Sequence, residues 1–247
     1  MPEGMDHKTG MFTAGSTADS FIKNLEGSLQ RLGVDYVDIA FLPFAARKES
    51  VFFEPYLKAM ENFKKQGKAR FIGIATHSYE PEAIKAAADT KIYDLVMTAY
   101  NFRKENGPQI KEAIAYAANA GLGIIAMKTM AGAYMDKERT QPVNASAALK
   151  WVLQDNNIHT IVPGFTTFDQ LTLNIQLMQN LGLTSEEKRW LSAYNYNTGE
   201  IYCQQCGECL PQCPGNVDIP TIMRSYMYAY GYKNLHHARQ TLLMAKL

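Results

Sequence analysis

The sequence predicts an α/β fold built on a parallel sheet, because short apolar runs alternate with segments of helical periodicity over residues 17–182. The apolar runs are hydrophobic on both faces, which is typical of strands covered on both sides by helices. No glycine-rich phosphate loop follows the first run, as a doubly wound dinucleotide-binding sheet would require. Together these observations favour a barrel of the (β/α)8 type, the TIM barrel.

Five strands and the helices between them are expected in order along the chain. The predicted strands cover Tyr36–Leu42, Ala69–Ala75, Asp94–Ala99, Gly123–Met127 and His159–Pro163. The predicted helices cover Thr17–Leu32, Glu54–Gln66, Pro81–Asp89, Pro108–Ala120, Asn144–Asp155 and Phe168–Asn180. A barrel of eight strands takes about 250 residues. Residues 1–182 are therefore predicted to form a barrel truncated to about five βα units, with open sheet edges through which copies of the chain would self-associate.

A second, smaller domain is predicted over residues 183–247, because the βα pattern stops at Gly182. Thr184–Glu187 (TSEE) is typical of a helix N-terminus. Ile219–Lys246 is largely helical in pattern and rich in tyrosine. We interpret this segment as a helical extension of the barrel.

Composition and charge exclude several classes of function. The net charge of +1 provides no basic excess for nucleic acid. No apolar run approaches the roughly 20 residues of a membrane-spanning helix. All four cysteines fall within eleven residues near the C-terminus, whereas a secreted disulfide framework would spread them out. This clustering indicates a cofactor site in a reducing compartment, so a cytoplasmic protein is expected.

The cysteine run predicts an iron–sulfur cluster, and we expect [4Fe–4S]. Its ligands are Cys203, Cys206, Cys209 and Cys213, in the spacing C-x2-C-x2-C-x3-C-P of bacterial ferredoxins. The alternative is a zinc site, but zinc sites usually pair two C-x2-C steps across a longer spacer. In two-cluster ferredoxins the fourth cysteine serves the other cluster. With only four cysteines in the chain, we favour Cys213 as the fourth ligand over a ligand that is not cysteine.

Several segments together resemble the aldo/keto reductases. These are Leu29–Asp38 (LQRLGVDYVD), Gly67–Gly73 (GKARFIG), Tyr100-Asn101, Gly123–Gly132 (GIIAMKTMAG) and Pro163–Asn174 (PGFTTFDQLTLN). Cys203–Pro220 looks like the C-terminal extension of that family's iron–sulfur branch. The resemblance implies a TIM barrel, a nicotinamide cofactor, NADP(H) or NAD(H), at the C-terminal strand ends, and reduction of a small carbonyl substrate.

The resemblance also implies a catalytic tetrad of Asp, Tyr, Lys and His, in which Tyr donates a proton to the carbonyl oxygen. Lys8 stands where the tetrad lysine is expected. The Asp and Tyr would belong to strands preceding Met1. The position of the histidine is occupied by Pro43, whose side chain has no donor.

The cofactor positions that the resemblance implies are partly replaced. Ala75-Thr76 stand in place of a Ser-Asn pair, Met97 in place of a glutamine, and Gln170 in place of the basic residue that binds the 2′-phosphate of NADP. The remaining candidates for cofactor binding are Thr76, Lys128, Thr166, Thr167 and Asn174. A helix N-terminus near Thr166 would offer free N–H groups to a phosphate.

Two functions are expected from the sequence. The first is an oxidoreductase of the aldo/keto reductase type that carries an iron–sulfur cluster. The second is a non-catalytic cluster protein that transfers electrons to a redox partner protein or senses redox state. In either case the cluster would act structurally or in electron transfer, since nicotinamide moves two electrons without it.

His77, just past a predicted strand, is a further candidate for lining a site.

Overall fold

A computed structural model of the chain describes residues 5–6, 9–13, 15–132, 134–136, 138–194, 209–215, 217–231 and 234–245. The chain divides into two compact units. The first comprises residues 1–100, 106–127 and 156–161, and the second comprises residues 101–105, 128–155 and 162–247. The domain boundary near residue 182 stays a prediction.

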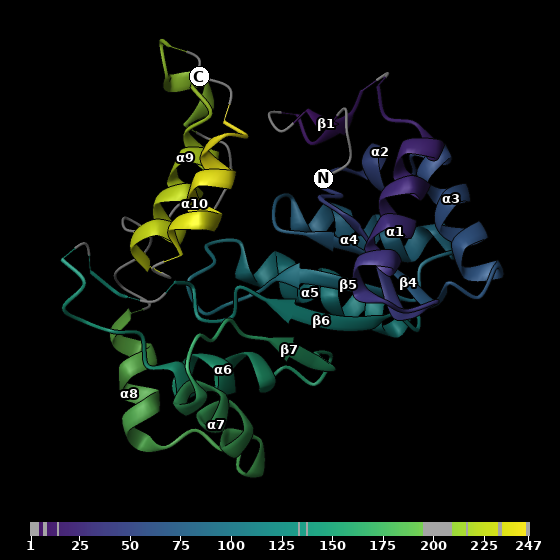
Figure 1. The fold of residues 1–247 in the computed structure, drawn as a ribbon. Coiled ribbons are helices and arrows are strands. Elements are labelled where there is room, and N and C mark those ends of the chain that lie inside the picture. The colour runs from purple at the N-terminus through teal and green to yellow at the C-terminus, as the bar shows by residue number, and fades with distance from the viewer. Residues whose placement is uncertain are drawn as a thin grey trace. The chain divides into compact units, whose positions relative to one another are not determined.

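The first unit is built on a five-stranded sheet in the order β3-β4-β5-β6-β7. The strands are β3 (Val37–Pro43), β4 (Ala69–Thr76), β5 (Leu95–Ala99), β6 (Gly123–Met127) and β7 (Thr160–Val162). Neighbouring strands from β3 to β6 are parallel, and Figure 1 shows helices alongside them. The α/β fold with five βα units predicted from the sequence is confirmed.

The helices of the first unit fall close to the predicted ranges. They are α1 (Ala18–Leu32), α2 (Lys48–Val51), α3 (Glu54–Lys65), α4 (Glu80–Thr90) and α5 (Gly107–Asn119). Thr17 caps α1 by accepting a hydrogen bond from Ser20 N at 3.2 Å. Gly33 ends the helix at φ 68°, a left-handed conformation that glycine adopts without a Cβ clash.

Two short elements of this unit were not predicted. They are α2 and a hairpin of β1 (Met5–Asp6) with β2 (Met11–Phe12). Each is too short to show a periodicity in the sequence.

Successive side chains along each strand point to opposite faces of the sheet, and the two faces differ in burial. On one face Leu42, Ile74, Val96 and Ile124 are fully buried, and α3, α4 and α5 contact β4, β5 and β6. Each such side chain contributes about 1.5–3 kcal/mol through removal from water. On the other face Ile39 of β3 lies opposite Phe71 of β4, and their exposed fractions are 36% and 45%.

The second unit is helical. Its helices are α6 (Ala145–Leu153), α7 (Phe168–Gln176), α8 (Ser185–Tyr194), α9 (Ile219–Tyr226) and α10 (Leu235–Leu242), with shorter turns η1 (Leu177–Gln179), η2 (Leu210–Gln212) and η3 (Met227–Gly231). The predicted helical stretch Ile219–Lys246 is interrupted, because η3 has π geometry and Asn234 starts a new helix by accepting from His237 N at 3.0 Å. None of the helices in the described part of the chain is long and apolar enough to cross a membrane.

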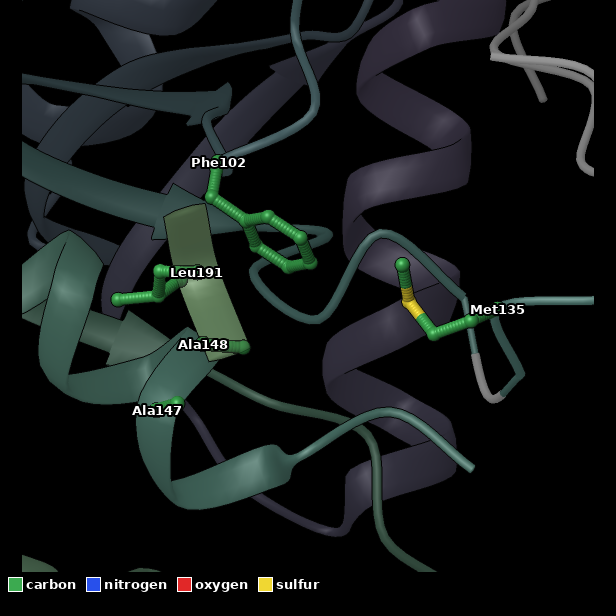
Figure 2. Close-up of a cluster of buried hydrophobic side chains, with 5 residues drawn as sticks. All are labelled: Phe102, Met135, Ala147, Ala148 and Leu191. Atoms are coloured by element: carbon green, nitrogen blue, oxygen red, sulfur yellow. The ribbon is translucent and has the colours of Figure 1, made fainter. Parts of the chain in front are cut away.

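A small apolar cluster forms the core of the second unit (Figure 2). It consists of Phe102, Met135, Ala147, Ala148 and Leu191, all buried. The Phe102 ring also packs on Trp190 of α8 at 5.2 Å between centroids. The cluster therefore joins α6, α8 and the loops that carry Phe102 and Met135.

A buried ion pair fixes α6 to α8 in the second unit. Lys150 of α6 donates to both carboxylate oxygens of Glu187 of α8, at 3.0 and 3.2 Å. Glu187 also accepts from Ser146 Oγ at 2.7 Å and from Thr184 N at 2.8 Å. Since Thr184 Oγ1 accepts from Glu187 N at 3.1 Å, the predicted helix start at TSEE is a complete capping box.

The pKa of Glu187 reflects this network. Burial alone would raise the pKa of the carboxyl, but the hydrogen bonds from Thr184, Ser146 and Lys150 outweigh it and lower the pKa from 4.5 to about 2. A carboxyl whose pKa is lower in the folded state stabilises the fold above the unfolded pKa and loses that contribution as pH falls. The network is therefore predicted to weaken between about pH 4.5 and pH 2.

Glu187→Gln is expected to destabilise the chain by about 3–5 kcal/mol, because it leaves the Lys150 ammonium buried without its carboxylate. Urea unfolding at neutral pH measures the loss, and Glu186→Gln at the exposed neighbouring position is the control. Between pH 4.5 and pH 2 the wild type should lose stability that the Glu187 variant does not. Equal pH profiles for the two proteins would contradict the role given to this carboxylate.

Candidate functional site

The residues at the carboxyl ends of β3 and β4 lie in the first unit, on the side where barrel enzymes place their sites. Pro43 is the last residue of β3. Thr76, the last residue of β4, is fully buried and its hydroxyl donates to Ser78 O at 3.0 Å. The His77 ring packs edge-on against Phe44 at 5.2 Å. The Thr76 hydroxyl thus binds the backbone of the loop that follows β4. Its contact with a cofactor stays a prediction.

The side chain of Asn101 hydrogen-bonds to two loops, the one after β5 and the one after β6, and both loops belong to the second unit. Its side chain is buried. The amide Nδ2 donates to Lys128 O at 3.0 Å, and Oδ1 accepts from Arg103 N at 3.0 Å. Sequence reasoning singled out Tyr100-Asn101 only by resemblance. In the structure Asn101 binds the backbone of Lys128, the first residue of the loop after β6.

Lys128, the first residue after β6, has an unusual backbone. Its φ is 57°, in the left-handed region that non-glycine residues avoid. The residue is exposed to solvent. Desolvation of the ammonium lowers the pKa of Lys128, and the nearby positive charge of Arg224 on α9 lowers it further. Arg224 was not among the predicted site residues, because nothing in its local sequence relates it to a residue so distant in the chain.

The N-terminus of α7 is closed by its own side chains. Thr167 Oγ1 accepts from Gln170 N at 3.3 Å, and Gln170 Oε1 accepts from Thr166 N at 2.7 Å. Lysine and arginine have no acceptor, so a basic residue at position 170 could not make the second bond. Asp169 adds negative charge in the first turn. The start of α7 is therefore poorly suited to bind a phosphate while Gln170 Oε1 occupies Thr166 N. Asn174, which is half-buried, lies about one turn further along the helix.

The described residues include two of the four predicted cluster ligands. Cys209 and Cys213 are half-buried and lie at the two ends of η2. The turn is closed by Gln212 N donating to Cys209 O at 3.2 Å. Lys8, Cys203 and Cys206 lie outside the described residues. Within the described part of the chain, no group of three or more His, Cys, Asp or Glu could hold a metal ion.

A separate pocket of about 930 Å³ lies at the opposite, amino-terminal end of the strands in the first unit. Ile39, Phe71, Asp94, Tyr116 and His159 are among its lining residues. The His159 ring is held in place, since its Nδ1 accepts from Ile124 N at 3.0 Å. None of the predicted site residues lines this pocket.

Comparison with known proteins finds similarity to the aldo/keto reductases over most of the chain. Residues 7–147 match the model of the aldo/keto reductase family. The methylglyoxal reductase DkgB of Escherichia coli O157:H7 is 26% identical over 189 residues, which cover 72% of this chain and 68% of that protein. The L-glyceraldehyde 3-phosphate reductase of Escherichia coli K12 is 23% identical over 232 residues, covering 74% of this chain and 65% of that protein.

Solved structures agree with the fold. The aldo-keto reductase of Bacillus halodurans in its holo form superposes with a TM-score of 0.57 at 18% identity, covering 77% of this chain and 71% of that one. A thermostable aldo-keto reductase bound to epalrestat superposes with a TM-score of 0.54 at 20% identity, covering 72% and 66%.

Asn101→Ala is expected to destabilise the chain by about 1–3 kcal/mol, because it removes the acceptor of Arg103 N and one of the two donors to Lys128 O, the other being Ala131 N. Thermal unfolding measures this, with Asn106→Ala as the control, since Asn106 makes no side-chain cap bond at the start of α5. If both variants unfold at the same temperature, Asn101 does not hold the loop.

Proposed function

The chain belongs to the aldo/keto reductase family, and from that premise we propose that it is an oxidoreductase whose C-terminal segment carries a [4Fe–4S] cluster. The domain division follows the same proposal, with a barrel-type part over residues 1–182 and a cluster-bearing extension over residues 183–247. Cys203, Cys206, Cys209 and Cys213 are the proposed ligands. Bound there, the cluster would supply either one-electron transfer or a structural link.

The observation that carries the cluster proposal is the spacing of the cysteines together with the conformation of the last two. Thiolates are the ligands that iron–sulfur clusters take. The turn η2 lies between Cys209 and Cys213, which are the residues flanking its two ends. Gly215 follows closely, and a Cβ at that position would lie only 3.9 Å from Cys213 Sγ. A compact turn of this kind suits a ligand pair on one small cofactor.

We further propose that the chain binds NADP(H) or NAD(H) and acts on a small carbonyl compound. The names of the relatives, a methylglyoxal reductase and an L-glyceraldehyde 3-phosphate reductase, support a small aldehyde or ketone. The proposed cofactor contacts are Thr76, Lys128, Thr166, Thr167 and Asn174, with Lys8 as the proposed catalytic lysine. The neutral amide of Gln170 cannot make the charged, paired hydrogen bonds that an arginine makes to the 2′-phosphate of NADPH. The proposal therefore includes no preference for NADPH over NADH.

A second candidate function is supported by Pro43. At the end of β3 the family's tetrad has a histidine that orients the carbonyl, and proline provides no hydrogen-bond donor. A cluster protein that exchanges electrons with a redox partner protein would not need this donor. The two functions differ in whether nicotinamide is consumed when a carbonyl compound is added.

The cluster proposal predicts that protein purified without oxygen contains about four iron and four sulfide per chain. Cys213→Ser should lose most of both, because it removes a thiolate ligand. Gln212→Ser, one residue away in the same turn, keeps every thiolate and is the matched control. Zinc bound in equal amount to the protein, without sulfide, would contradict the proposal.

The position of Pro43 predicts slow carbonyl reduction. Loss of one positioned donor to a developing oxyanion typically costs about 10²–10³-fold in kcat. NADPH and NADH consumption with methylglyoxal and other small aldehydes measures the rate, with the Escherichia coli methylglyoxal reductase assayed alongside. Turnover equal to that of the relative would exclude the electron-transfer candidate and show that another group replaces the histidine.

A further inference from the structure

One face of α10 leaves large apolar side chains in contact with water. Leu235 and Leu243 have exposed fractions of 73% and 78%, and Leu242 is exposed as well. Arg239 is exposed and lies four residues from both Leu235 and Leu243. Side chains three, four or seven residues apart share one face of a helix. Leu235, Arg239, Leu242 and Leu243 therefore form one surface, the α10 face.

The other side of α10 is fixed to α9. Ala238 and Thr241 are buried there, and Ser225 Oγ of α9 donates to Ala238 O at 2.7 Å. Figure 1 shows the two helices side by side. The α10 face is thus not the side by which this helix joins the second unit. Burial of its leucines against another molecule would remove further apolar surface from water.

The end of the chain that includes α10 is basic. Residues 219–247 contain two lysines, two arginines and no aspartate or glutamate, so their formal charge is +4. Residues 1–218 carry −3. Among the described residues, Arg239 forms no ion pair with a carboxylate. Such a positive segment attracts a negatively charged partner and speeds its association.

The elements that pack on α10 also expose two tyrosines. The rings of Tyr226 and Tyr230 lie 4.6 Å apart, and both residues are exposed. The Arg139 guanidinium lies 5.5 and 5.7 Å from their ring centroids. Between these tyrosines, Tyr228 of η3 meets the ring of His237 of α10 edge-on at 4.2 Å. Tyrosine and arginine are enriched among the residues that dominate binding between proteins.

A protein partner fits the α10 face better than a lipid surface does. Helices that lie on membranes keep their basic residues on one face and their apolar residues on the other. On α10, by contrast, Arg239 shares a face with Leu235 and Leu243. Protein interfaces combine apolar side chains with arginine in this way.

The α10 face belongs to the same segment of chain as the proposed cluster ligands. The helix α9 begins at Ile219, six residues after Cys213. Six residues span at most about 20 Å, and α10 packs directly on α9. A protein docked on the α10 face would therefore lie near a cluster held by Cys213. Iron–sulfur clusters exchange single electrons, which favours a partner that carries them.

We propose that the α10 face is the docking surface for an acidic protein that exchanges single electrons with the C-terminal cluster. The leucines provide the apolar centre of the interface, and Arg239 with the basic end of the chain attracts the partner. One electron passes between the two proteins, so one is oxidised and the other is reduced by one electron, and no bond forms or breaks. The electron transfer rests on the proposed function, whereas the docking does not.

Calorimetric titration of the full chain, purified without oxygen, tests the docking. The probes are two small acidic electron carriers, flavodoxin, which holds FMN, and a plant-type [2Fe–2S] ferredoxin. The wild type should bind at least one probe, and the affinity should fall as salt is added, because salt screens the attraction between charges. Leu243→Gln and Arg239→Glu should each weaken the Kd by about 10-fold or more.

Arg189→Glu is the matched control for Arg239→Glu, because Arg189 is an exposed arginine of α8 and its replacement changes the net charge equally. Leu32→Gln, at the exposed end of α1, is the control for Leu243→Gln. Both controls should bind the probe as the wild type does. Equal losses in Arg189→Glu and Arg239→Glu, or no binding of either probe at low salt, would overturn the proposal.

Two further measurements examine other occupants of this surface. Sedimentation of the chain alone reports on a second copy, and flotation with phosphatidylglycerol vesicles reports on lipid. Self-association or vesicle binding that Leu243→Gln abolishes would assign the α10 face to that occupant and overturn the proposal. A monomer that stays off the vesicles and binds a carrier through Arg239 and Leu243 would support it.

Iron and sulfide analysis of the same samples separates this inference from the proposed function. Carrier binding that depends on Arg239, in protein without iron, would support the docking surface and count against the cluster. A full content of iron and sulfide without carrier binding would support the cluster and overturn the docking surface.

Discussion

Parallel pairing of the strands is the constraint on which the rest of the first unit depends. The register from β3 to β6 aligns the strands so that their carboxyl ends fall at one edge of the sheet. It also places Leu42, Ile74, Val96 and Ile124 on the face that the helices cover. A slip of one residue in any strand would exchange the two faces. Hydrophobic burial therefore fixes the carboxyl ends of β3 and β4, where Pro43 and Thr76 lie.

A buried ion pair is central to the second unit. The Lys150–Glu187 pair is almost entirely removed from water, and it is stable because Ser146 and Thr184 satisfy the remaining acceptor capacity of the carboxylate. Asn101 has a comparable role at the loop after β6. Several buried side-chain atoms make no hydrogen bond among the described residues, including Arg224 Nε and the hydroxyls of Thr129 and Thr98.

Replacement of family residues has physical consequences that the structure makes visible. Gln170 lacks the charge of a phosphate-binding arginine, but its carbonyl oxygen accepts from Thr166 N and closes the start of α7. Pro43 cannot donate a hydrogen bond, although it continues the backbone of β3 without a break. Both residues suit the local backbone, and neither side chain offers the group that the family resemblance implies at its position.

The sequence by itself determined the order of strands and helices, the caps at Thr17 and Thr184, and the cysteine spacing, because each depends on residues close together in the chain. Only the tertiary structure decided that Lys150 meets Glu187 and that Lys128 takes a left-handed φ. Local patterns report which face of an element is apolar. They contain no information about which distant side chains packing will bring together, as it does for Lys150 and Glu187.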